Sequence, residues 1–201
     1  MLSIPRPHRL AAGVLALAAL AQAADYSSWS RYRDVTVKTD GLGLTAPVKK
    51  IPLLVRFNAA DHADMLNNVS TQISADGADV RVTKADGTTD VPFEIEQATT
   101  GANGSLVLWV LADSVGQNAA NAAKFRVFWG KAGETSMSNG TAVFDTANGY
   151  RAVYHMNGTG SEERDATIMA NHMAASDSVV ASVPGTANGM IGPARDFVGD
   201  S

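Results

Sequence analysis

Glu94 and Glu96 are the residues whose type and spacing come closest to a catalytic pair. On a β-strand, residues two apart share a face with their Cα atoms roughly 7 Å apart, a spacing that brings two carboxylates into the range used by glycosidases. The corresponding glycosidase strand motif has a further glutamate three positions later, where this chain has Thr99. We therefore predict that both glutamates are solvent-facing charges beside Phe93 and Ile95, without a catalytic role.

Four aspartates flank tight turns and offer the oxygen ligands that Ca²⁺ prefers. Their spacing fits no EF-hand loop, which needs alternating acidic ligands and a distal glutamate. Asp-Gly is also the commonest turn sequence. We predict turn residues and assign no metal ligand and no cofactor, with Ca²⁺ kept as the minority alternative. The four residues are Asp76, Asp79, Asp86 and Asp90.

The histidines give no recognisable catalytic or zinc site. His62, His155 and His172 do not assemble into the three-ligand set that zinc requires. No Gly-x-Ser-x-Gly motif occurs, and the chain has no cysteine to act as a nucleophile. We expect His155 to be packed or hydrogen-bonded within a strand over residues 150–156, and His172 to lie in a loop. The prediction is a protein that is not an enzyme.

Sugar binding would need exposed aromatic side chains. Trp109 and Trp129 each have apolar neighbours on the same face of their segments, which favours core packing. Tyr26 and Trp29 precede the first expected strand and are freer candidates for such a contact. Nucleic acid is not an expected partner, because the net charge is -4 and the pI is about 5.5.

The first 23 residues have the pattern of a secretory signal peptide. Basic residues precede an apolar run over residues 10–20, and Ala21-Gln-Ala23 offers the small residues that a signal peptidase accepts. We predict cleavage after Ala23 and export to the periplasm, the cell surface or the medium, with a retained anchor as the alternative. No later segment has the ~20 apolar residues of a transmembrane helix, so none is predicted in the mature chain.

Alternation of apolar and polar residues predicts six strands within residues 24–144. Residues 75–96 are expected to form a β-hairpin. Residues 105–112 are apolar on both faces, which predicts a central strand buried from two sides. Pro52 favours an edge position for its strand. The predicted fold is all-β, an antiparallel β-sandwich; the other strands are expected at 32–39, 51–57 and 124–130, with a short helix between 58 and 67.

Residues 145–201 differ in composition and form a second predicted unit. Strands are expected at 150–156 and 189–199, too few to bury a core of their own. Either they pack on the sandwich or the chain opens a longer protein, and we favour the second.

Several ordered motifs resemble a known family. They are Trp29 with Arg31-Tyr32, residues 75–82, residues 91–96, Leu108-Trp-Val110, and residues 125–130 with Ser138-Asn139. Together, from Trp29 to about Phe144, they resemble a bacterial domain of unknown function that occurs in exported proteins and often precedes a concanavalin-A-like (laminin-G-like) jelly roll. The segment from Tyr150 onward resembles the incomplete start of such a jelly roll, through Val153-Tyr-His-Met156, Asp165 with Asn171-His172, and residues 189–197.

The resemblance implies an architecture and a location but no chemistry. Our leading hypothesis is a non-catalytic, exported recognition or adhesion module that binds polysaccharide or a surface protein. Relatives of this kind also occur in proteins resembling biopolymer-transport proton channels, so an extracytoplasmic module of such a complex is the second hypothesis. An accessory part of a polysaccharide-degrading enzyme is the third.

Overall fold

The computed structural model of the chain describes residues 23–118, 120, 122–157, 162–174, 186–189, 191 and 193–195. The predicted signal peptide, apart from Ala23, lies outside these residues, as does most of the predicted strand over residues 189–199. Among the described residues, no helix is long and apolar enough to cross a membrane.

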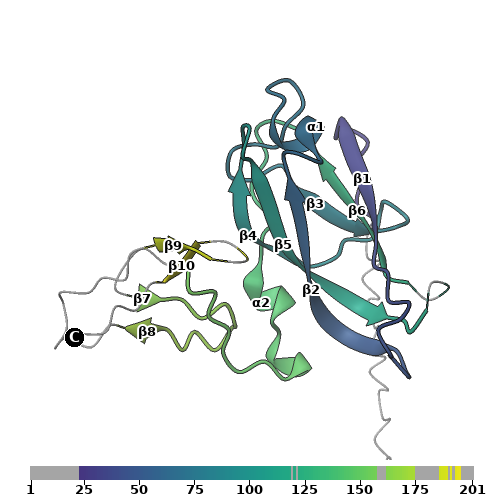
Figure 1. The fold of residues 1–201 in the computed structure, drawn as a ribbon, viewed down its shortest axis with the longest axis vertical. Helices are drawn as coiled ribbons and strands as arrows, with labels where there is room; N and C mark the ends of the chain where they lie inside the picture. Colours follow the sequence, from purple (N-terminus) through teal and green to yellow (C-terminus); the bar gives the residue numbers. More distant parts are fainter. Residues whose placement is uncertain are drawn as a thin grey trace, which may run out of the picture.

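Two antiparallel three-stranded sheets form the first part of the chain (Figure 1). One has the order β2-β5-β4, and the other has the order β1-β6-β3. Apolar side chains from both sheets form one buried cluster, which includes Leu108 and Val110 of the first sheet and Val82 and Val127 of the second. The predicted all-β sandwich is therefore confirmed. The strands are β1 (Arg31–Thr36), β2 (Val48–Asn58), β3 (Arg81–Lys84), β4 (Phe93–Thr99), β5 (Ser105–Val115) and β6 (Lys124–Trp129).

β5 is the central strand of its sheet, as its sequence predicts. Leu106 and Leu108 point into the cluster between the sheets, and Val107, on the opposite face, is also fully buried. Because Val107 is buried on the outer face, other parts of the chain must cover that face of the sheet. Pro52 lies on the edge strand β2, where its missing N–H costs no ladder hydrogen bond.

The predicted hairpin over residues 75–96 is only partly correct. Its two arms meet at Thr83 and Asp90, and the N–H of Val91 donates to the carbonyl of Val82. After Pro92 the chain crosses to the other sheet, where β4 pairs with β5. Alternation identifies a strand but not its partner, and a sandwich needs strands that change sheets.

The helices of the described residues are single turns. α1 (Ala63–Leu66) buries Met65 and Leu66, within the region where a short helix is predicted. α2 (Gly140–Val143) and a 3-10 turn, Thr146–Asn148, follow the sandwich. Figure 1 shows α2 between the sandwich and the C-terminal hairpins.

The predicted strand over residues 150–156 is wrong, because this segment has only one bridge, from Tyr154 to Asp165. Asp165 organises the region instead: its buried carboxylate accepts from the N–H groups of Val153, Thr167 and Asn171 at 2.9 to 3.0 Å. Burial would raise the pKa of Asp165, but these hydrogen bonds outweigh it and lower the pKa to about 2. Two short pairs complete the described part: β7 (Glu162–Glu163) with β8 (Met173–Ala174), and β9 (Thr186–Asn188) with β10 (Pro193–Arg195).

Asp79 ties the loop before β3 to the end of β6. Its carboxylate accepts from the N–H and hydroxyl of Ser74 at 2.9 and 2.8 Å and from the N–H of Gly130 at 2.7 Å. The residue is 3% exposed. Removal of this carboxylate would leave all three donors without an acceptor. Asp79 therefore links two parts of the sandwich and is not free to bind a ligand.

We predict that Asp79→Ala lowers the free energy of unfolding by about 3 kcal/mol, because it strands buried donors that bind a charged acceptor. Urea denaturation followed by tryptophan fluorescence measures the change. Asp76→Ala is the matched control, since Asp76 is exposed and accepts from the N–H of Ala78 in a surface turn. An equal loss of unfolding free energy in the two variants would contradict this structural role of Asp79.

Candidate functional site

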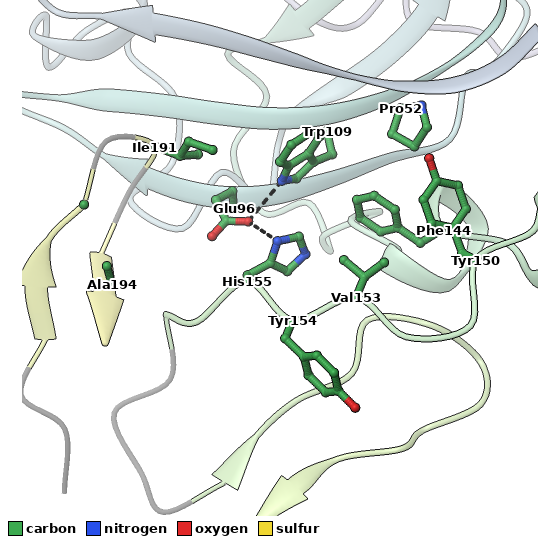
Figure 2. Close-up of a pocket in the computed structure, with 11 residues that line it drawn as sticks. Pro52, Glu96, Trp109, Phe144, Tyr150, Val153, Tyr154, His155, Ile191 and Ala194 are labelled. Carbon is green, nitrogen blue, oxygen red and sulfur yellow. Dashed lines mark hydrogen bonds and ion pairs between the residues drawn. The ribbon is translucent and has the colours of Figure 1, made fainter. Parts of the chain in front are cut away.

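A pocket of about 510 Å³ lies between the outer face of the β2-β5-β4 sheet and the segment over residues 150–157 (Figure 2). Its wall on the sheet side consists of Pro52, Glu96 and Trp109, and α2 is followed by Phe144, which also lines it. Aromatic rings make up much of the lining, and the charged groups are gathered at one position. The remaining lining residues are Tyr150, Val153, Tyr154, His155, Gly189, Ile191 and Ala194.

Strand pairing places the acidic groups of this pocket. Glu94 lies opposite Trp109 in the β4-β5 ladder, and the register shifts between Ile95 and Gln97, which makes Glu96 part of a β-bulge. Both glutamates still present their carboxylates to one side of the sheet, because both reach the same imidazole.

That imidazole belongs to His155 and sits between the two carboxylates. His155 Nε2 lies 2.9 Å from Oε2 of Glu94, and Nδ1 lies 2.7 Å from Oε2 of Glu96. Glu96 also accepts from Trp109 Nε1 at 3.1 Å and from the side-chain amide of Asn157 at 2.8 Å. Figure 2 shows the contacts of Glu96 with His155 and Trp109. We call Glu94, His155 and Glu96 the histidine clamp.

The clamp changes the titration of its members. Burial would lower the pKa of His155, but hydrogen bonds and the charges of Glu94 and Glu96 outweigh it and raise the pKa to about 10. Burial would raise the pKa of Glu96, yet the hydrogen bonds from His155, Trp109 and Asn157 leave it below its usual range. At neutral pH the histidine is therefore a cation that donates from both ring nitrogens, and Glu96 is an anion.

The prediction that Glu94 and Glu96 face solvent is wrong. The side chain of Glu96 is 3% exposed and that of Glu94 is 17% exposed. They do share the face opposite the core, as the spacing implies, but residues 150–157 cover that face. The sequence separation of 61 residues between Glu94 and His155 hides the partner from any local pattern.

The two tryptophans predicted to be in the core have different positions. Trp129 is 1% exposed and belongs to the cluster between the sheets, as predicted. Trp109 lies on the outer face, stacked on His155 with ring centroids 6.1 Å apart and edge-on to Phe144 at 5.8 Å. The covering layer thus has an aromatic part beside its charged part.

The segment before α2 braces β4 next to the clamp. Ser138 accepts from the N–H of Ile95 through its hydroxyl at 2.8 Å, and the N–H of Asn139 donates to the carbonyl of Phe93. A Cβ at Gly140 would lie 2.5 Å from Oε1 of Glu94, so only glycine fits there without moving that carboxylate.

The clamp is poorly suited to acid–base chemistry at neutral pH. A glycosidase needs one protonated carboxyl group as acid, whereas Glu96 is held ionised. A general base needs a free lone pair, whereas both nitrogens of His155 are engaged. The imidazole also fills the space between the two carboxylates, where a substrate would have to lie.

The other residues considered as candidates, and predicted to have no such role, are bound by their own surroundings. The carboxylate of Asp86 accepts from the hydroxyl of Thr89 and from the N–H groups of Thr88 and Thr89, as a turn residue should, and these bonds lower its pKa to about 2. Asp90 accepts from the hydroxyl of Tyr26. His172 lies in a loop, as predicted, and its Nδ1 accepts from the N–H of Asp165. In the described ranges, no three His, Cys, Asp or Glu side chains gather as metal ligands would.

We predict that His155→Gln lowers the free energy of unfolding by about 3 kcal/mol near pH 6, because it leaves two covered carboxylates without a cation. The folded pKa of His155, about 10, exceeds its ordinary value of 6.5. The contribution of the clamp is therefore complete below pH 6.5 and is lost as pH rises toward 10. Denaturation of both proteins across this range measures the difference.

His62→Gln is the matched control. His62 packs edge-on against Phe57, and its Nδ1 has no hydrogen-bond partner among the described residues. The change in unfolding free energy that His62→Gln causes should not follow the pH dependence expected for His155→Gln, because His62 has no carboxylate partner in the clamp. A difference between wild type and His155→Gln that stays constant from pH 6.5 to pH 10 would contradict the assignment.

Residues 76–164 match the model of a family described as a domain of unknown function, DUF2341. The matched stretch contains Glu94, Glu96 and His155, so all members of the clamp lie within it, and it continues past Phe144 into the second predicted unit. No significant match was found among curated proteins or among solved structures. Over this stretch the chain is similar to a family of unknown function, as its motifs predict.

Proposed function

We propose that this chain is a non-catalytic recognition module, exported from the cell, that binds polysaccharide or protein in the periplasm or at the cell surface. The observation that carries the proposal is the histidine clamp. The best candidate for a catalytic carboxylate pair is bridged by a cation and largely covered, so the pair links the sandwich to the segment over residues 150–157.

A link of this kind suits a module that presents a second unit in a fixed position. β4 supplies both carboxylates, and the segment after α2 supplies His155 and Asn157. The lining aromatic rings then lie on a scaffold that does not need to move. Preorganised surfaces lose less conformational entropy on binding, which favours recognition.

Export is supported by the N-terminal sequence and by the contact that follows it. The proposed cleavage site lies after Ala23, and the N–H of the next residue, Ala24, donates to the carbonyl of Thr88 at 2.9 Å. Cleavage there would leave the folded contacts of the sandwich intact. A concanavalin-A-like unit after the sandwich remains part of the proposal, supported by the antiparallel pairs β7-β8 and β9-β10.

We predict that the purified chain releases no reducing ends from a panel of polysaccharides but is retained on an immobilised polysaccharide or by a surface protein. Glu94→Gln should leave both results unchanged apart from stability, because Glu94 carries no catalytic role. Asp76→Asn, which removes an exposed carboxylate in a surface turn, is the control. Hydrolysis that is lost in Glu94→Gln and kept in Asp76→Asn would refute the non-enzymatic function.

A further inference from the structure

A second feature lies on the outer face of the β1-β6-β3 sheet, where residues 24–30, which we call the N-terminal arm, cross the sheet. Tyr26 donates its hydroxyl to Asp90 at 2.5 Å, and Trp29 donates Nε1 to the carbonyl of Asp79 at 2.7 Å. Tyr26 also packs on Phe128, with ring centroids 5.2 Å apart. Tyr26 is 9% exposed, so this residue, expected to be free for ligand contact, instead anchors the arm.

A groove of about 340 Å³ remains beside the arm, between it, β1, β6 and the turn after β3. Its volume suits one or two rings of a small ligand. The floor is aromatic, and the rim carries hydroxyl and carboxylate groups. The residues that matter for a ligand are Asp25, Ser27, Tyr32, Asp86, Thr88 and Arg126.

Tyr32 is the exposed aromatic side chain of this groove. Tyr32 is 57% exposed. Among the large hydrophobic side chains that are exposed in the described residues, it is the aromatic one. A single exposed ring is common on a protein surface, but Tyr32 also lines the groove. Its place in the groove, rather than its exposure, makes Tyr32 the candidate contact.

Two side chains of β6 pack against the ring of Tyr32 and restrict it. The guanidinium of Arg126 lies over it, 4.1 Å from the centroid, and Phe128 lies at 5.8 Å on the opposing strand. Arg126 is fixed in turn by two hydrogen bonds to Asp34, at 2.7 and 3.0 Å. A rigid aromatic platform binds with little loss of side-chain entropy.

The charges around the groove disfavour an anionic ligand. Arg126 is paired with Asp34. Lys131, which lies over the ring of Trp29, is paired with Glu134. The rim adds the carboxylates of Asp25 and Asp86. Hydrogen bonds from Ser27 to Asp25, and from Thr89 and Thr88 to Asp86, lower the pKa values of these two carboxyl groups, so both stay ionised at neutral pH. The groove therefore disfavours phosphate, sulfate and uronate groups, while its carboxylate and hydroxyl oxygens suit the hydroxyl groups of a neutral ligand.

We propose that this groove binds a neutral sugar ring of a polysaccharide, with the sugar's C–H face stacked on the face of Tyr32 opposite Arg126 and its hydroxyl groups directed to the rim. The negative face of an aromatic ring attracts the weakly positive C–H groups of a sugar, and the polar rim supplies direction. This inference rests on the proposed recognition function and names both its ligand class and its surface.

The test is affinity gel electrophoresis of the purified full chain through gels containing hydroxyethylcellulose, laminarin or galactomannan, with polygalacturonate and heparin as anionic comparators. Intrinsic tryptophan fluorescence, to which Trp29 in the groove contributes, gives a second readout. We expect retardation by at least one neutral polysaccharide. Tyr32→Ala should weaken it about tenfold or more, the loss expected for one aromatic contact, whereas Tyr32→Phe keeps the ring and most of the affinity.

Leu42→Ala, which removes another exposed apolar side chain, is the control, and circular dichroism verifies that each variant is folded. Binding that is unaffected by Tyr32→Ala, or retardation by the anionic polymers alone, would overturn the site while leaving a recognition function in place. The same holds for capture of a protein partner without any polysaccharide binding. Hydrolysis of a polysaccharide, by contrast, would refute the proposed function itself.

Discussion

The imidazolium of His155, shared between Glu94 and Glu96, is the interaction on which the rest of this structure depends. Burying two carboxylates on the outer face of a sheet is costly unless a cation and further donors satisfy them. His155, Trp109 and Asn157 supply those partners from two different parts of the chain. The outer face of β4 and β5 can therefore be covered, and the segment after α2 has a defined place against it.

The outer faces of the two sheets are covered to different extents. Most of β5 is covered on both faces, with apolar packing inside and the charged and aromatic residues of the pocket outside. The sheet containing β6 is covered at one end by the N-terminal arm and keeps an open groove beside Tyr32. The histidine clamp thus lies on the outer face of the first sheet, and the exposed ring of Tyr32 lies on that of the second.

Local patterns in the sequence predicted the strands well, because side chains on a strand alternate with a period of two whatever the strand pairs with. β2, β5 and β6 lie where alternation or a continuous apolar run indicated, and Pro52 correctly indicated an edge. Alternation failed at Pro92, where the chain changes sheets. It also failed at residues 150–156, whose conformation depends on hydrogen bonds to Asp165 and on the histidine clamp instead of on pairing with a strand.

The candidate site was predicted less well than the fold, because its contacts join residues that are far apart in the sequence. The spacing of Glu94 and Glu96 correctly placed them on one face, but their exposure depended on a partner far away in the sequence. Tyr32 alternates like any strand residue, and its contact with Arg126, which Asp34 binds in turn, depends on strand pairing that alternation does not reveal. A histidine with an aromatic neighbour gives no local sign that it will lie between two acids.

The protonation state of His155 tests the central claim most directly. Imidazole ¹⁵N chemical shifts, followed by NMR in the folded protein, distinguish a histidine with both ring nitrogens protonated from a neutral tautomer. If the clamp is correct, His155 remains doubly protonated at about pH 8, well above the ordinary range for histidine. A neutral imidazole at that pH would contradict the clamp, and with it the claim that Glu94 and Glu96 fasten the fold rather than perform catalysis.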